Sequence, residues 1–225
     1  SDRLELEIGG ETFVLQHHKG ETDDQLYVWV PGRKALASAD YYQGFLPNAG
    51  NGKRYQRHVE EWAAAMREMA ALQPDILLPA HGAPITESAT IVENFTVLAD
   101  ALQYVVDVTI EGLNEGKRKD LIFGAIELPE HLASHPTLNV QYVSVSDISK
   151  MVIKKYTGWW DDIPSHWTPA SMEDQGEMII ELAGGNIAAT VEYARVLIAT
   201  DIRLASHLTD WLFYARPDDP DVQQL

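Results

Sequence analysis

Short runs in which apolar and polar residues alternate open the chain, and they predict a β-sheet. Leu4-Glu5-Leu6-Glu7-Ile8 alternates with a period of two, and the Gly9-Gly10 pair after it is typical of a tight hairpin turn. Further apolar runs lie on both sides of Pro31-Gly32, a pair that favours a turn. The strands that we expect from these runs span residues 4–8, 12–15, 26–30, 35–39 and 76–78.

Most of the remaining apolar residues recur at helical spacing. Those between residues 55 and 72 lie on one helical face, and Pro74 ends the predicted helix. A long helix is expected to begin near Thr86, whose hydroxyl can cap it, and to end at Gly116. Further helices are expected at residues 172–182, where Ser171 and Asp174 resemble a capping box, at residues 187–198, and from Asp201 onward, with Asp201 as the cap.

This order of elements predicts an α/β part followed by an all-α part. We place the boundary inside the long helix, near residue 105, because the strand patterns end before it and helical patterns follow it. The predicted domains are therefore residues 1–105 and residues 106–225.

Composition narrows the classes of function. The chain has 225 residues, 45% of them hydrophobic, with a formal net charge of −17 and no cysteine. An acidic balance without a basic stripe argues against a nucleic-acid partner. No apolar run approaches the ~18 residues that span a bilayer. The lack of cysteine excludes disulfides, thiolate zinc sites and cysteine nucleophiles, and it leaves the cellular compartment open.

Three side chains that can ligate a metal each come directly before or after a predicted strand. Glu21 precedes the strand at residues 26–30, Asp40 ends the next strand, and His81 follows the last one. Taken singly, such an acid can cap a helix and a His-Gly pair can form a turn. Taken together, two carboxylates and an imidazole at strand ends indicate a metal site.

These landmarks resemble the second half of the metallo-β-lactamase superfamily. Gly20-Glu21-Thr22, Asp40 and Ala80-His81-Gly82 follow the order of its metal-binding motifs, and Glu21 in place of the usual histidine is similar to the alkylsulfatase branch. Residues 156–161, Tyr-Thr-Gly-Trp-Trp-Asp, and residues 181–185, Glu-Leu-Ala-Gly-Gly, resemble later motifs of that branch. The resemblance implies the second half of a metallo-β-lactamase-like αββα sandwich, followed by a helical dimerisation domain that forms a homodimer.

The activity that this resemblance implies is that of a binuclear zinc hydrolase, which cleaves a small anionic ester, an alkyl sulfate, to an alcohol and sulfate. Glu21 and His81 would each ligate one zinc ion, and Asp40 would bridge both. The first ligands of the family form a His-x-His-x-Asp-His motif, and none of the eight histidines here lies in such a motif. We therefore expect the chain to lack the N-terminal half of the metal domain, which would lie in the same polypeptide or in a separate chain.

The same resemblance gives four further candidate residues. Asn48, Lys53 and Arg54 lie in the loop that the family uses to bind sulfate. The alternative interpretation is that they are ordinary loop residues exposed to solvent. Lys53 stands where the resemblance places an arginine of the family. Lysine is a point charge without the bidentate fork of arginine, so this difference changes the expected geometry of sulfate binding. Asp147 stands where the family has a histidine near the reacting group. An aspartate of ordinary pKa is a poor general acid at neutral pH, which argues against ordinary alkylsulfatase chemistry.

Two other functions stay open at this stage. One is a hydrolase of the same fold that acts on another ester, a lactone or an amide. The other is a non-catalytic oligomerisation module with a degenerate metal site. Trp159, Trp160 and Trp167 lie close together in the sequence, and we interpret them as packing residues, with a wall for an alkyl chain as the alternative.

Overall fold

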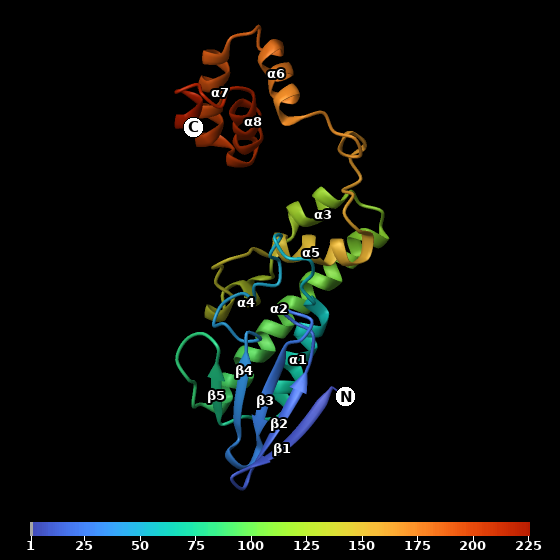
Figure 1. Cartoon of the computed structure of the whole chain (residues 1–225), viewed down its shortest axis with the longest axis vertical. Helices are drawn as coiled ribbons and strands as arrows, with labels where there is room; N and C mark the ends of the chain where they lie inside the picture. The colour runs from blue at the N-terminus through green and yellow to red at the C-terminus, as the bar shows by residue number, and fades with distance from the viewer. Residues whose placement is uncertain (1) are drawn as a thin grey trace. The chain divides into compact units, whose positions relative to one another are not determined.

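The computed structural model describes residues 2–225, which divide into two compact units (Figure 1). The first unit extends to Asp162 and contains the sheet and helices α1 to α5. The second unit, Ile163–Leu225, contains helices α6 to α8. Among the described residues, no helix is both long and apolar enough to cross a membrane.

A mixed five-stranded sheet forms the N-terminal part of the first unit, with strands in the order β1-β2-β3-β4-β5. The first four strands pair antiparallel, whereas β5 pairs parallel to β4, with Leu36 opposite Leu77. A parallel neighbour requires a crossover connection, which here contains helix α1. The strands are β1 (Arg3–Ile8), β2 (Glu11–His17), β3 (Leu26–Val30), β4 (Ala35–Ala39) and β5 (Ile76–Pro79), as the apolar pattern predicted.

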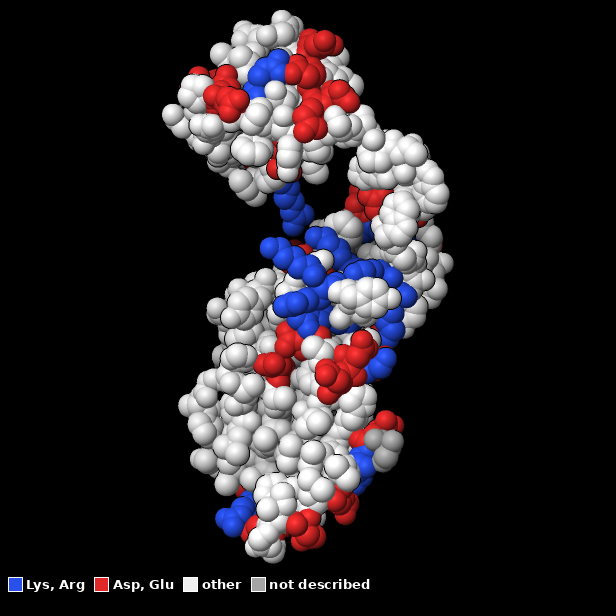
Figure 2. Space-filling model, viewed as in Figure 1, with Lys and Arg blue, Asp and Glu red and all other residues white. Residues whose placement is uncertain are grey.

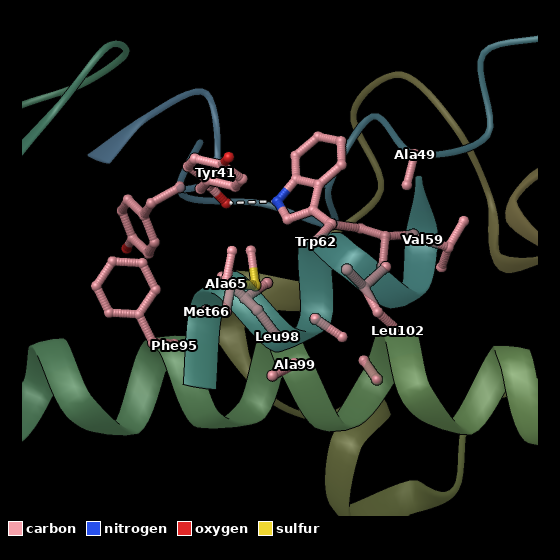
Figure 3. Close-up of a cluster of buried hydrophobic side chains, with 14 of the residues drawn as sticks. Tyr41, Ala49, Val59, Trp62, Ala65, Met66, Phe95, Leu98, Ala99 and Leu102 are labelled. Carbon is pink, nitrogen blue, oxygen red and sulfur yellow. Dashed lines mark hydrogen bonds between the residues drawn. The ribbon is translucent and has the colours of Figure 1, made fainter. Parts of the chain in front are cut away.

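Helices α1 (Val59–Ala71) and α2 (Ser88–Asn114) pack together and form the main core of the unit (Figure 3). The fully buried Trp62 contributes the largest side chain, and its indole N–H donates a hydrogen bond to the Tyr41 carbonyl oxygen at 3.0 Å. The expectation that Thr86 caps the long helix is wrong. Helix α2 begins after Glu87, and no side chain caps it.

Helix α5 (Val145–Thr157) packs against α2 and α3 (Lys119–Ala125). Its first turn has a capping box, in which Ser144 and Asp147 bind each other's backbone N–H groups. The remaining short helices of this unit are α4 (Glu130–Ala133) and the 3-10 turns Pro31–Arg33 and Pro136–Leu138.

An ion-pair cluster joins the C-terminal half of α5 to the start of α1. The Lys155 ammonium lies 2.8 Å from Glu60 Oε2, and the Tyr156 hydroxyl donates to Glu60 Oε1 at 2.7 Å. Partial burial acts to raise the pKa of Glu60, but these two hydrogen bonds outweigh it and hold the pKa below the ordinary value of 4.5.

The Glu60 cluster is expected to lose its stabilising effect in acid. A carboxylate with a lowered pKa in the folded state stabilises the fold fully above its unfolded pKa, and this contribution is lost as the pH falls through the lowered value. Urea unfolding of the Glu60→Gln variant across the acid range should therefore show a shallower dependence on pH than the wild type. The same change at the exposed Glu127 is the control and should keep the wild-type slope; equal slopes in all three proteins would contradict the prediction.

Three helices make up most of the second unit, and each begins at a side-chain cap. Ser171, Asn186 and Asp201 accept hydrogen bonds from backbone N–H groups in the following turn, as expected for Ser171 and Asp201. The helices are α6 (Met172–Leu182), α7 (Ile187–Thr200) and α8 (Ile202–Ala215), with 3-10 turns at Pro164–His166 and Val222–Gln224. Their shared core contains Ile180, Val191, Ala194, Leu208, Leu212 and Val222.

The predicted boundary near residue 105 lies inside α2, which is continuous from Ser88 to Asn114. The two compact units divide at a different place, after Asp162. The two divisions rest on different definitions, because a division into compact units does not show where a metal-binding domain ends and a dimerisation domain begins. The boundary at residue 105 therefore stays a prediction.

Gly176 sets the approach of α6 to α8, and replacing it is expected to destabilise the second unit. A Cβ atom built on Gly176 lies only 2.2 Å from the Trp211 carbonyl oxygen, which is backbone and cannot rotate away. Forcing two packed helices apart costs about 1–3 kcal/mol. Hydrogen exchange should therefore show lower protection in α6 and α8 of the Gly176→Ala variant. A Cβ on Gly124 meets no atom within 4 Å, so Gly124→Ala is the control; unchanged protection at Gly176→Ala would refute the close contact.

Candidate metal centre

The parallel pairing of β4 and β5 brings two of the three candidate ligands together. Since the carboxyl ends of parallel strands meet at one edge of a sheet, Asp40 after β4 and His81 after β5 share that edge. His81 Nε2 lies 3.0 Å from Asp40 Oδ1. A register shift between Ala37 and Ala39, with Ala39 at φ +47°, turns the chain just before Asp40.

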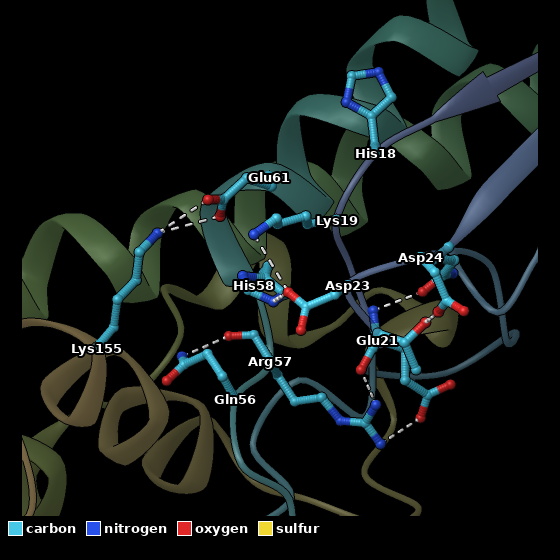
Figure 4. A network of polar contacts seen from close by, with 12 residues as sticks. His18, Lys19, Glu21, Asp23, Asp24, Gln56, Arg57, His58, Glu61 and Lys155 are labelled. Carbon is cyan, nitrogen blue, oxygen red and sulfur yellow. Dashed lines mark hydrogen bonds and ion pairs between the residues drawn. The ribbon is translucent and has the colours of Figure 1, made fainter. Parts of the chain in front are cut away.

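Glu21 lies in the loop between β2 and β3, where a buried arginine holds it (Figure 4). Arg57 Nη2 lies 2.8 Å from Glu21 Oε1, and Arg57 also donates to the Glu21 backbone carbonyl. The Glu21 N–H donates to Gln25 Oε1 at 2.6 Å. The side chains of Arg57 and Glu21 are only 5% and 17% exposed, so water screens this pair weakly.

The two carboxylates of the set act on each other. Burial is the main cause that raises the pKa of Glu21 above its ordinary value. The positive charge of Arg57 opposes the shift, while the charge of Asp40 and a side-chain hydrogen bond with Asp40 add to it. Asp40 therefore contacts both His81 and Glu21 at one edge of the sheet, and the roles of the three residues as metal ligands stay a prediction.

The side chains present fit part of a zinc site. Asp40 Oδ1 is buried and has no hydrogen-bond partner among the described residues, although His81 Nε2 is near it. A buried carboxylate oxygen without a partner is costly, and a divalent cation would satisfy it. Even so, within residues 2–225 no three His, Asp or Glu side chains gather closely enough to hold a metal ion by themselves. The donor chemistry suits zinc, but the set is incomplete.

The loop after Asp40 brings two of the proposed sulfate-binding residues to one hollow. Asn48 donates from Nδ2 to Glu21 Oε1 at 3.4 Å, which places its amide beside the metal-binding candidates. Asn48 and Lys53 line a cavity of about 420 Å³, together with Asp147. Arg54 instead lines a neighbouring cavity of about 400 Å³ that Glu21 and Arg57 also line. Asn48 and Arg54 therefore lie near Glu21, whereas Lys53 shares a cavity with Asn48, and the contact of all three with an anion stays a prediction.

Asp147 has a structural task in this fold. Its carboxylate accepts hydrogen bonds from the Ser144 N–H and hydroxyl at 2.9 and 2.8 Å, and Lys150 lies 3.2 Å away. Partial burial acts to raise its pKa, but the hydrogen bonds from Ser144 and Lys150 outweigh it and lower the pKa below the ordinary value. Asp147 is therefore ionised at neutral pH and has no proton to donate as an acid.

Sequence reasoning missed Arg57 and His58, which lie directly before α1. Arg57 holds Glu21, and His58 Nε2 lies 2.8 Å from Asp23 Oδ1 (Figure 4). Both side chains are almost fully buried, at 5% and 10% exposure. Neither belongs to a motif, and more than 30 residues separate each from its partner along the sequence. The one sequence signal for Arg57 and His58 is that they are two adjacent basic residues at the start of an amphipathic helix.

Comparison with known proteins shows which proteins this chain is similar to. The chain is 27% identical over 222 residues to the linear primary-alkylsulfatase of Pseudomonas sp. (strain ATCC 19151), covering 97% of this chain and 42% of that protein. It is 22% identical to alkyl/aryl-sulfatase BDS1 of Saccharomyces cerevisiae, covering 98% of this chain and 35% of that one. The solved structure of the inverting sec-alkylsulfatase Pisa1 from Pseudomonas sp. has the same fold, with a TM-score of 0.89 and 20% identity over 99% of this chain and 36% of that chain.

The chain is homologous to alkylsulfatases over nearly its full length. More particularly, residues 119–225 match the family described as alkyl sulfatase dimerisation, and the mixed sheet and helices before them share the fold of the corresponding part of Pisa1. Both the predicted resemblance and the predicted fold class are confirmed. The chain spans less than half the length of the relatives that it matches.

Proposed function

We propose that this chain supplies part of a binuclear zinc hydrolase that cleaves alkyl sulfate esters to an alcohol and sulfate. The meeting of Glu21, Asp40 and His81 at one sheet edge carries the proposal, since Asp40 lies 3.0 Å from His81 Nε2 and shares a side-chain hydrogen bond with Glu21. The missing ligands would come from an N-terminal half of the metal domain, in the same polypeptide or in a separate chain.

Each side chain has a definite task in this proposal. Glu21 and His81 would each hold one zinc ion, and Asp40 would hold both. When bound, zinc supplies Lewis-acid activation of a water molecule near neutral pH. Arg57 keeps Glu21 in place through two contacts, one to its carboxylate and one to its backbone carbonyl.

Binding of the sulfate ester would fall to the loop after Asp40. Asn48 can donate from its amide, while Lys53 and Arg54 supply positive charge in a chain whose net charge is −17. This local charge matters because the overall acidic field disfavours an anionic substrate. Since Asp147 is an ionised helix cap, the proposed reaction does not use it as a proton donor.

One observation favours a second candidate, a non-catalytic oligomerisation module. No metal-binding group of three side chains is found among residues 2–225, and such a chain could serve association alone. Metal analysis separates the two candidates, because the hydrolase requires about two zinc ions in each complete site.

The proposal is tested on the complete enzyme, made by joining this chain to a polypeptide with the His-x-His-x-Asp-His motif. Release of sulfate and alcohol from alkyl sulfates is measured beside hydrolysis of matched carboxylic esters, lactones and amides. Zinc-dependent sulfate release supports the proposal. Hydrolysis of only the other substrates would point to a different hydrolase of this fold, and neither activity nor zinc would support the module.

The second unit is expected to mediate self-association. Its helices expose large apolar side chains that a monomer would leave in water. Introducing a charge by Leu204→Glu, at a side chain that is 55% exposed, should therefore shift a dimer toward monomer. Sedimentation at micromolar concentration measures the effect. Leu4→Glu, at a residue that is 53% exposed in the first unit, is the control; a monomeric wild type would rule out a stable dimer.

A further inference from the structure

A cavity of about 340 Å³ lies beside the C-terminal half of α5, outside the candidate metal centre. Its lining combines two chemistries, large apolar side chains and lysine ammonium groups. The apolar part comes from Phe123, Ile153, Trp159 and Trp160, and the cationic part from Lys119, Lys150 and Lys154. A pocket of this volume can hold a small molecule.

Positive charge gathers around this cavity in an otherwise acidic protein. Eight of the 17 Lys and Arg residues lie in three short segments, residues 53–54, 117–119 and 150–155. The three segments meet here, since Lys119, Lys150 and Lys154 line the cavity and the Lys154 ammonium contacts the Arg54 carbonyl oxygen at 3.1 Å. Figure 2 shows blue side chains gathered over the region of α3 and α5 in this unit.

Acidic residues offset part of this charge, since Lys117, Arg118 and Lys155 form ion pairs with Glu115, Asp120 and Glu60. Asp147 lies 3.2 Å from the Lys150 ammonium, Asp162 lies 3.6 Å from that of Lys119, and Asp161 is part of the lining. Lys154 is different. Its ammonium donates only to backbone carbonyls, and no described carboxylate lies within ion-pair distance of it. No described carboxylate therefore competes with a ligand for the Lys154 ammonium, which contacts the Arg54 and Tyr55 carbonyl oxygens and lies 5.6 Å from the centre of the Tyr55 ring.

The apolar wall is also partly open to a ligand. Trp159 is 73% exposed at the cavity although it is one of the largest apolar side chains in the chain. Gly158, at φ +79°, ends α5 and turns the chain so that Trp159 follows at the rim. A tryptophan beside lysines suits a ligand with an apolar tail and an anionic head.

This cavity is continuous with the loop of the candidate metal centre. Gly52 lines it and also lines the neighbouring cavity formed by Asn48, Lys53 and Asp147. Asn48 in turn donates to Glu21. A ligand bound here would therefore lie next to the loop that we propose binds the sulfate ester.

We propose that the cavity between α3, α5 and the Trp159-Trp160 segment binds single-chain anionic amphiphiles, of which alkyl sulfates are one class. Lys150 and Lys154 hold the anionic head, and the tail lies against Trp159, Trp160 and Phe123. As a first binding site for the substrate, it would raise the local concentration of an anion that the net charge of −17 otherwise repels. This role as a substrate-capture site rests on the proposed hydrolase function.

The binding test uses this chain alone, with no zinc and no turnover, and titrates octyl and decyl sulfate calorimetrically below their micelle concentrations. Decyl sulfate is expected to bind more tightly, by up to about fourfold for each added methylene that is buried. Decanol and decyltrimethylammonium test the anionic head, and both should bind at least tenfold more weakly. Equal binding of decanol and decyl sulfate would overturn the proposal.

Variants then locate the site. The double variant Lys150→Gln/Lys154→Gln should weaken decyl sulfate binding at least tenfold, whereas Lys34→Gln, an exposed control beside Asp75, should not change it. Because Lys154 also contacts the loop at Arg54, Trp159→Ala tests the tail without touching a lysine and should reduce the dependence on chain length. Unchanged binding in both variants would overturn the proposal.

A last comparison separates free amphiphiles from a lipid surface. Vesicles of phosphatidylglycerol are mixed with the wild-type chain and with the lysine double variant. Vesicle binding that depends on these lysines, without binding of decyl sulfate monomers, would replace the proposed ligand with a membrane surface. If the complete enzyme releases no sulfate but this chain still binds decyl sulfate, the hydrolase proposal is refuted and the binding site stands.

Discussion

Replacing Asp40 by alanine is expected to lower zinc-dependent sulfate release by the complete enzyme by about 10³-fold or more. Asp40 is the central residue of the candidate set, because His81 Nε2 lies 3.0 Å from it and the charge of Asp40 helps to raise the pKa of Glu21. Losing a single preorganised electrostatic contact at a reacting centre commonly costs 10²–10³-fold, and here the loss would affect the binding of two ions. Zinc content and initial rates, measured together, give the result.

The fold should survive this change. Asp40 lies at the end of β4 and is not part of the apolar core, so the circular dichroism of the variant should match the wild type. Asp75→Ala is the matched control, since Asp75 is an exposed aspartate beside β5 that pairs only with Lys34. Full activity with two zinc ions in the Asp40→Ala enzyme would rule out the bridging role.

Much of the candidate site could be predicted because strand ends are readable from sequence. Apolar runs of three to five residues located β2 to β5, and the acids and histidine next to them followed directly. That Asp40 and His81 meet depends on the parallel pairing of β4 and β5, which the helix between two strands favours. The resemblance to a known family then indicated that an acid, an aspartate and a histidine in this order are metal ligands.

The parts that could not be predicted depend on contacts between distant residues. Nothing local to Arg57 indicates that it pairs with Glu21, 36 positions earlier, because the loop between β4 and α1 has no periodic pattern to place it. Thr86 had the right side chain for a helix cap, yet the isolated bridge between Leu77 and Ile85 holds this segment extended and delays the helix. In both cases tertiary structure overrides a local preference.

The same reasoning explains why capping was predicted better in the second unit than in the first. Ser171 and Asp201 directly precede strongly amphipathic helices, and each side chain accepts from the turn that follows it. The family resemblance suggests that Asp147 replaces a histidine, whereas Ser144 three residues earlier forms a capping pattern with it, and the structure shows that capping box.

Arg57→Ala is expected to destabilise the first unit by about 3–5 kcal/mol, the usual cost of breaking a buried ion pair. The guanidinium has little access to water, and burial lowers the pKa of Arg57, against the opposing effect of Glu21. Without it, Glu21 would remain buried beside Asp40 with one of its main charge partners removed. Urea unfolding in the absence of zinc measures the loss.

A second substitution shows whether the buried charge of Glu21 causes this loss. Arg57→Met/Glu21→Gln removes both charges while keeping similar volumes, so it should recover most of the stability that Arg57→Ala loses. Arg67→Ala, which breaks an exposed pair with Asp100, is the control and should cost at most about 1 kcal/mol. If the double variant is as unstable as Arg57→Ala, Arg57 acts mainly through packing and through the Glu21 backbone carbonyl.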